Sequence, residues 1–368
     1  MECQSRCVAI PNGGAFAAEG QILYVKADKP GDAHKRMPRV ERTAAPNLRR
    51  DPNLVSVIIP VYGEIESART ALTSALDQTY RPIEVIIVND GCPNSVELEA
   101  TIAPFRSAIR YVIQPHGGAG AARNSGIIQS TGGLIAFLDA DDRWRPDFLA
   151  EGVASLNRIP RCDLVYCDAL ITGSSPRAGR RFMETSPSKG PVTLEALLLQ
   201  RCNVITSCVL VRASALFEVG LFDVALRRGQ DYDLWLRMAE HGCRFAYDRT
   251  VRVERTERSW GSPEESIADV ERLLSVLTRF EKRTNLTPEA AAAIRTRIEW
   301  AGDRLLLEHA KRALELHDVR GARQQLVGIR RKSVKARAVL AALLLAPSLT
   351  PVLYRFWRHR YQRRRTTA

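Results

Sequence analysis

The sequence predicts an α/β protein whose central sheet is mostly parallel. Between residues 53 and 262, short continuous apolar runs rich in Val and Ile alternate with segments whose apolar residues recur at helical spacing. Such runs are typical of strands buried on both faces of a parallel sheet, and their alternation with helices is typical of βαβ units. The composition allows a sizeable core, since 45% of the 368 residues are hydrophobic and 26% are charged.

The first strand is expected over 54–62, LVSVIIPVY, and a helix over 66–79 follows it with Ala68, Leu72 and Ala75 on one face. The same patterns predict the later elements. These are a strand over 83–90, a helix near 94–105, a strand over 109–114, a helix ending near 130, an apolar run over 133–142, a helix over 147–157, a strand over 162–171, a polar insert over 172–191, an apolar segment over 203–223 and a helix starting near Gln230.

The change of texture along the chain predicts four parts. Residues 1–52 are rich in Gly, Pro, Ala and charge and are expected to be a loosely ordered extension, with one short strand at QILYVKA (21–27). Residues 53–262 form the sheet domain, with a boundary near 255–263. Residues 263–329 are helical, and residues 330–368 form a basic and apolar C-terminal segment.

The basic character of the chain belongs to its C-terminal segment. From Arg330 to Ala368 there are eleven Lys and Arg and no Asp or Glu, so only +2 of the net charge of +13 lies before Arg330. No recognition motif accompanies these charges, so nucleic acid is not expected as a partner.

Residues 338–354, AVLAALLLAPSLTPVLY, carry no charge and have basic residues on both sides. A spanning helix needs about 20 apolar residues, and Pro347 and Pro351 interrupt this stretch. We therefore expect an interfacial or re-entrant helix held to an anionic membrane surface by 330–368. The alternative is a C-terminal helix packed on the protein, followed by a solvated basic tail.

The cysteines and the N-terminus predict a location in the cytoplasm. Eight cysteines are scattered without a CxxC pair, and several lie inside apolar runs, which favours free thiols in a reducing compartment and no zinc site. The N-terminus has no basic region followed by an apolar stretch of signal-peptide length. Together with the C-terminal segment, this predicts a peripheral protein on the cytoplasmic face of the membrane.

Acidic residues follow several predicted strands, at the end where open α/β sheets bind ligands. Glu64 follows the first strand, Asp90 ends the second, and Asp139, Asp141 and Asp142 follow the apolar run LIAFL. An Asp-x-Asp at such a place can hold Mg²⁺ or Mn²⁺. The alternative is that one acid caps the next helix and the others are solvated.

The stretch GGAGAARNSG (117–126), with an acid about twenty residues later, has the appearance of a dinucleotide-binding fingerprint. Three features argue against that function. The third fingerprint position is Arg123 instead of Gly or Ala, two βα units precede the stretch, and the downstream acid belongs to a cluster.

Five motifs in order resemble the inverting family 2 nucleotide-sugar glycosyltransferases of GT-A fold. They are VSVIIPVYGE, IEVIIVNDG, GGAGAARNSGI, GGLIAFLDADDRW and GQDYDLWLRM, and they cover about 53–256. The resemblance implies a GT-A type, Rossmann-like, mostly parallel sheet domain. It also implies a nucleoside diphosphate sugar as donor, a glycan or lipid-linked hydroxyl as acceptor, and Mg²⁺ or Mn²⁺ as cofactor.

The resemblance also implies roles for individual residues. The nucleotide-sugar would be bound by Pro60, Tyr62, Glu64, Asp90, Gly120, Arg123, Asn124, Asp139 and Asp141. Asp141, assisted by Asp139, would hold the cation at the diphosphate. Trp144 either stacks on the acceptor sugar or lies in the core.

An acceptor hydroxyl is too weak an acid to attack unaided at neutral pH, so a general base is required. The resemblance places it at Asp231, at the start of the helix near Gln230; the alternative is a helix N-cap, with Asp233 as a first-turn acid. The family often has Glu-Asp here, and this chain has Gln230. Relatives also often carry a histidine near 252–258, where this chain offers Arg255 or Arg258.

Two other functions stay open at this point. A sugar-nucleotide nucleotidyltransferase also places acids at strand ends, but it usually needs a basic glycine loop after the first strand, and PVYGEIES has none. A catalytically degenerate transferase domain acting as a scaffold is the non-enzymatic alternative, which Gln230 supports.

Overall fold

The computed structural model describes residues 23–24, 50–226, 228–258, 263–283, 286–330, 334–350, 352 and 354. Most of the predicted extension 1–52 and the basic residues after Tyr354 lie outside the described residues. Cys3 and Cys7 are also outside them.

The described residues form one nine-stranded sheet with the order β1-β4-β3-β2-β5-β8-β7-β9-β6. Parallel pairing joins β1 to β4, β4 to β3, β3 to β2 and β2 to β5, whereas β8 is antiparallel to both of its neighbours. The strands are β1 (Leu23–Tyr24), β2 (Asp51–Val61), β3 (Ile83–Asp90), β4 (Ile109–Gln114), β5 (Gly132–Phe137), β6 (Arg143–Trp144), β7 (Leu164–Gly173), β8 (Val209–Arg212) and β9 (Phe245–Glu257). The prediction of a mostly parallel α/β sheet is confirmed.

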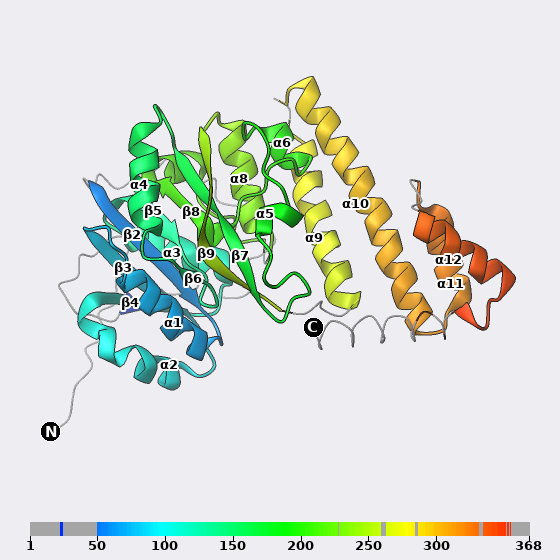
Figure 1. The fold of residues 1–368 in the computed structure, drawn as a ribbon, viewed down its shortest axis with the longest axis horizontal. Helices are drawn as coiled ribbons and strands as arrows, with labels where there is room; N and C mark the ends of the chain where they lie inside the picture. Colours follow the sequence, from blue (N-terminus) through cyan, green and yellow to red (C-terminus); the bar gives the residue numbers. More distant parts are fainter. Residues whose placement is uncertain are drawn as a thin grey trace.

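Helices cover both faces of this sheet (Figure 1). The helices of the sheet region are α1 (Ile65–Leu76), α2 (Ser95–Ile102), α3 (Ala119–Gln129), α4 (Phe148–Arg158), α5 (Phe182–Thr185), α6 (Leu194–Leu198), α7 (Ala213–Val219) and α8 (Gln230–Glu240), with 3₁₀ turns η1 (Ala103–Ala108) and η2 (Thr206–Cys208). Alternate residues of β2 enter opposite cores, because successive side chains of a strand point to opposite faces. Ile58 belongs to the buried cluster that includes residues of α3, α7 and α8, whereas Val57 and Ile59 belong to the cluster that includes residues of α1, α2 and α4.

The strand β9 was not predicted from the sequence. It pairs in parallel with β7 along almost its whole length, and β6 pairs with it in the opposite direction. Its C-terminal part, RTVRVERTE, has five charged residues and only two valines, so it lacks the continuous apolar run that marked the other strands. The strand matters for the site because it brings Thr256 to the acids that follow β5.

The C-terminal region is helical, as predicted, with α9 (Pro263–Glu281), α10 (Pro288–Glu315), α11 (Val319–Gly328) and α12 (Val334–Leu345). Figure 1 shows α9 and α10 beside α8 and α6, with α11 and α12 beyond them. Phe280 and Ile294 share a buried cluster with the sheet, whereas Leu314, Leu326 and Leu343 belong to a separate small core. The division into parts at 262 and 329 stays a prediction.

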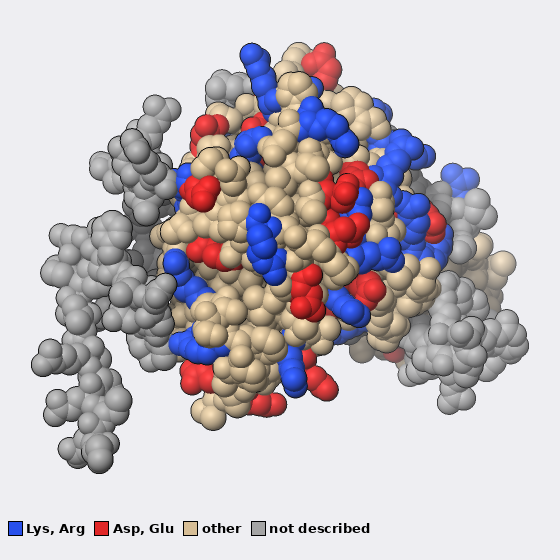
Figure 2. All heavy atoms as spheres, turned by 60° about the vertical axis from the view of Figure 1, so that its left-hand side comes forward, with Lys and Arg blue, Asp and Glu red and all other residues tan. Residues whose placement is uncertain are grey.

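Charges of both signs are interspersed on the face shown in Figure 2. This face carries no large area of one sign, which agrees with the near balance of charge before Arg330.

Candidate active site

Three aspartates follow β5, and each has a different interaction partner in the structure. Arg123 forms an ion pair with Asp139, with 2.5 Å between Nη2 and Oδ1. Asp142 is buried and accepts a hydrogen bond from the backbone N–H of Thr256 at 2.9 Å. The hydroxyl of Thr256 donates to the carbonyl oxygen of Asp141 at 2.5 Å, so β9 fixes the backbone of this segment.

Two of these acids have raised pKa values. Burial raises the pKa of Asp141, and the nearby charges of Asp139 and Glu64 raise it further. Burial, with Asp139 and Asp141 adding to it, raises the pKa of Asp142 to about 7. Carboxylates that lie close together in a partly buried site tend to be protonated unless a cation neutralises their charge.

The residues present fit a divalent cation. Asp141 and Asp139 offer carboxylate oxygens, which Mg²⁺ and Mn²⁺ prefer, and water and phosphate oxygens would complete the coordination. In the described part of the chain, no group of three or more His, Cys, Asp or Glu is arranged to hold a metal by itself.

Asp90 orders the glycine-rich stretch. Its Oδ1 accepts hydrogen bonds from Gly117 N at 2.8 Å and Gln114 Nε2 at 2.6 Å, and its Oδ2 accepts from Gly118 N at 2.8 Å. His116 Nδ1 lies 3.0 Å from the same Oδ2. Four partners use the acceptor capacity of a carboxylate. A direct contact of Asp90 with a nucleobase would require one of these partners to move.

The other residues singled out in the glycine-rich stretch face partners inside the protein. Arg123 is 5% exposed and lies with its guanidinium 5.4 Å from the ring of Phe222. Both amide atoms of Asn124 bond the backbone of Phe222, at 2.8 and 3.0 Å. A Cβ at Gly120 would lie 3.2 Å from Cγ of Gln230, so this glycine permits close packing against α8. In the structure these three residues contact other residues of the protein, and their part in nucleotide binding stays a prediction.

Tyr62 and His116 form the exposed side of this region. Their rings stack with centroids 4.0 Å apart, and Tyr62 is 45% exposed. Pro60 is the penultimate residue of β2 and lies two positions before Tyr62, and Glu64 forms an ion pair with Arg258 at 3.1 Å. An exposed aromatic pair beside polar groups is a suitable surface for a nucleobase.

Asp231 lies in the first turn of α8, while Gly229 takes the N-cap position with a φ of 75°. The alternative role of Asp231 as the N-cap is therefore wrong. Its Oδ1 accepts from Tyr232 N at 2.8 Å, and its Oδ2 accepts from the Thr206 hydroxyl at 3.1 Å. Asp233 is buried and paired with Arg237, so Asp231 is the first-turn acid left to act on a substrate.

Stacking of Trp144 on an acceptor sugar, one of its two expected roles, is wrong. Its side chain is 3% exposed, its indole N–H donates to the carbonyl oxygen of Ser207 at 2.7 Å, and its ring packs on Phe148. The core role left open by the sequence is the one that the structure shows.

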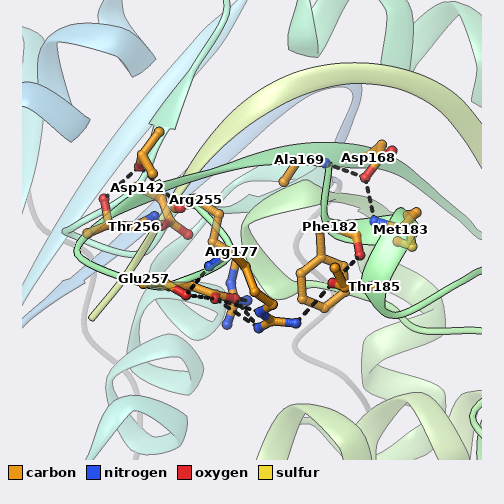
Figure 3. A network of polar contacts seen from close by, with 12 residues as sticks. Asp142, Asp168, Ala169, Arg177, Phe182, Met183, Thr185, Arg255, Thr256 and Glu257 are labelled. Carbon is orange, nitrogen blue, oxygen red and sulfur yellow. Dashed lines mark hydrogen bonds and ion pairs between the residues drawn. The ribbon is translucent and has the colours of Figure 1, made fainter. Parts of the chain in front are cut away.

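A polar network joins the insert 172–191 to the end of β9 (Figure 3). Glu257 forms ion pairs with Arg177 and Arg255, with 2.6 and 2.5 Å between the guanidinium nitrogens and Oε1. Both guanidinium groups lie over the ring of Phe182. Arg255 is therefore engaged in the protein, whereas Arg258 is exposed and faces Glu64. Of the two arginines considered for phosphate contact, Arg258 is the accessible one.

Thr206, Ser207 and Thr256 were not singled out from the sequence, although each contacts a candidate site acid. Thr206 and Ser207 could have been found from the sequence as two hydroxyl residues inside the apolar run NVITSCVLV, because buried hydroxyls need hydrogen-bond partners.

Comparison with known proteins identifies the sheet domain. The family model described as Glycosyl transferase family 2 matches residues 56–220. Residues 56–220 are a family 2 glycosyltransferase domain. An uncharacterized glycosyltransferase of Rickettsia prowazekii (strain Madrid E) is 36% identical over 192 residues, covering 50% of this chain and 58% of that protein. The amylovoran biosynthesis glycosyltransferase AmsB of Erwinia amylovora is 31% identical over 203 residues, covering 52% of this chain and 65% of that protein.

Solved structures agree on the fold of the glycosyltransferase domain. The mannosyltransferase PcManGT of Pyrobaculum calidifontis, in complex with GDP-Man and Mn²⁺, aligns with a TM-score of 0.56 at 19% identity over 87% of this chain and 89% of that one. Residues 1–349 of S. aureus TarS, in complex with UDP-GlcNAc, align with a TM-score of 0.53 at 15% identity over 83% and 91%. The expected GT-A fold with a C-terminal helical region is confirmed.

Proposed function

We propose that the protein transfers a sugar from a nucleoside diphosphate sugar to a hydroxyl of a glycan or lipid-linked acceptor, with inversion at the anomeric carbon. One observation carries the proposal. Within a family 2 glycosyltransferase domain, carboxylates with raised pKa values gather directly after β5, where a cation and a diphosphate would neutralise them.

The nucleoside would lie over Tyr62 and His116, beside Pro60 and Glu64, with Asp90 and Gly120 shaping the loop behind it. Asp141, with Asp139, would hold Mg²⁺ or Mn²⁺, and Arg123 and Asn124 would fix the segments that carry these contacts. The cation, when bound, supplies charge neutralisation of the diphosphate leaving group.

Asp231 would act as the general base. In the reaction, the acceptor oxygen forms a bond to the anomeric carbon, the bond from that carbon to the diphosphate oxygen breaks, and the acceptor proton passes to Asp231. The exposed Arg258 is placed to meet phosphate oxygens if its ion pair with Glu64 opens.

The test is to incubate the protein with UDP-, GDP- and dTDP-sugars and Mn²⁺ and to identify the released product. Nucleoside diphosphate supports glycosyl transfer. Pyrophosphate would instead indicate a sugar-nucleotide nucleotidyltransferase, and no turnover with any donor and a range of acceptors would favour a degenerate scaffold.

We propose in addition that the protein is peripheral on the cytoplasmic face of a membrane. Among the described residues, no helix is both long and apolar enough to cross a bilayer. The end of α12 and the residues after it nevertheless expose apolar side chains: Leu344 is 55% exposed, Leu345 86%, Leu349 59% and Val352 53%. Six arginines follow in the sequence, a combination that favours an anionic lipid surface.

A further inference from the structure

The 3₁₀ turn η2 lies between the two halves of the candidate active site. Thr206 is 4% exposed and Ser207 is fully buried, and the two residues are consecutive in the chain. Each hydroxyl reaches a different group of acids.

The hydroxyl of Thr206 orients Asp231. It donates to Oδ2 at 3.1 Å, while the backbone N–H of Tyr232 holds Oδ1 at 2.8 Å. Among the described residues, no other side chain hydrogen-bonds to Asp231. One contact on each oxygen fixes the carboxylate in place and leaves acceptor capacity for a proton.

Ser207 is tied to the acids after β5. Its Oγ accepts from the backbone N–H of Asp139 at 3.1 Å and hydrogen-bonds to the carboxyl of Asp142. Its carbonyl oxygen accepts from the indole of Trp144 at 2.7 Å. The turn is thus attached to the acid segment at Asp139 and Asp142, and to Trp144 two residues after it.

We infer that η2 sets the spacing between the base and the cation-binding acids, with Thr206 as the positioning residue for Asp231 and Ser207 as the positioning residue for the segment Asp139–Asp142. This inference rests on the proposed function. Inversion requires the base and the departing diphosphate to lie on opposite sides of the anomeric carbon, so an error in their spacing lowers the rate of the chemical step.

The first experiment measures steady-state transfer by Thr206→Val, which keeps the shape of the side chain and removes the hydroxyl. We expect kcat to fall about 10- to 100-fold, as for a lost hydrogen bond to a charged group, with KM for the donor changed less than about 2-fold. Thr206→Ser should recover most of kcat because it restores the hydroxyl. Ser155→Ala, which removes another buried hydroxyl in α4, is the matched control and should behave as wild type.

The second experiment measures Ser207→Ala. We expect the Mn²⁺ concentration for half-maximal rate to rise by about tenfold, whereas kcat at saturating Mn²⁺ changes less than about 3-fold, because the base stays in place. Thr206→Val should leave the Mn²⁺ requirement unchanged.

The inference is overturned if Thr206→Val keeps the wild-type kcat, if Thr206→Ser is as slow as Thr206→Val, or if both turn variants show the same change. Thermal melting verifies that each variant folds, and Thr206→Ala, with the same expected loss, replaces the valine variant if that one does not. Asp231→Asn separates the two proposals. If it is inactive while Thr206→Val is fully active, the base assignment stands and the role of η2 does not; if it is fully active, the base assignment itself is wrong.

Discussion

Asp142 is a residue whose ionisation links pH to stability. Its pKa in the folded chain is about 7, raised from 3.8 by burial and then by Asp139 and Asp141. The folded state therefore binds its proton more tightly than the unfolded state. The free energy of unfolding contributed by this group falls as pH rises from about 4 to about 7, and the loss is complete above that value.

We predict that Asp142→Asn, whose amide oxygen can still accept from Thr256 N, raises the melting temperature by at least about 2 °C at pH 8 in EDTA. The gain should shrink towards pH 5, where the wild-type carboxyl is mostly protonated. Thermal melts of both proteins from pH 5 to 8 measure this gain. A difference in melting temperature that stays constant or changes sign with rising pH would contradict a raised pKa of Asp142.

The sequence predicts where the site residues lie in the fold better than it predicts which groups their side chains contact. Spacing after strands placed Asp139, Asp141 and Asp90 at the ends of their strands, as the structure shows. It could not show that Asn124 bonds Phe222, because that partner is 98 positions away in the chain. The roles of the candidate site residues in catalysis stay predictions.

The glycine-rich stretch allows α3 to pack closely on β2. A Cβ at Gly126 would lie 2.5 Å from Cγ2 of the fully buried Ile58. In α10, by contrast, a Cβ at Gly302 would meet nothing within 4 Å.

The two Gly→Ala substitutions should therefore change stability in opposite directions. We expect Gly126→Ala to lower the free energy of unfolding by about 1–3 kcal/mol through overpacking. Gly302→Ala should raise it by about 0.5–1 kcal/mol because alanine favours a helix interior. Denaturant titration of both variants tests this, and equal signs would contradict the packing of α3 on β2.

Element prediction succeeded where a single physical signal dominated. The runs at 83–90 and 109–114 match β3 and β4 because strands buried on both faces are continuously apolar. The charged strand β9 was not predicted from the sequence, because its polar residues have partners far away in the chain. The backbone N–H of Thr256, for example, donates to Asp142. The turn η2 was missed for the same reason.

For the whole molecule, the apolar end of α12 should decide whether the protein binds membranes. We predict that Leu345→Glu, at an 86% exposed position, reduces co-flotation with anionic vesicles at least fivefold without lowering the melting temperature. Val96→Glu, at an 84% exposed position in α2 of the sheet region, is the matched control and should float as wild type. Flotation that is unaffected by Leu345→Glu, or equal with zwitterionic vesicles, would contradict the membrane proposal.

We propose that Asp231 is the base of a glycosyl transfer in which the acids after β5 serve the diphosphate. The most direct test compares transfer by Asp231→Asn with its binding of nucleoside diphosphate in the presence of Mn²⁺. We predict a loss of kcat of at least about a thousandfold, with the nucleotide dissociation constant unchanged within about twofold. Transfer at a wild-type rate by Asp231→Asn would contradict it.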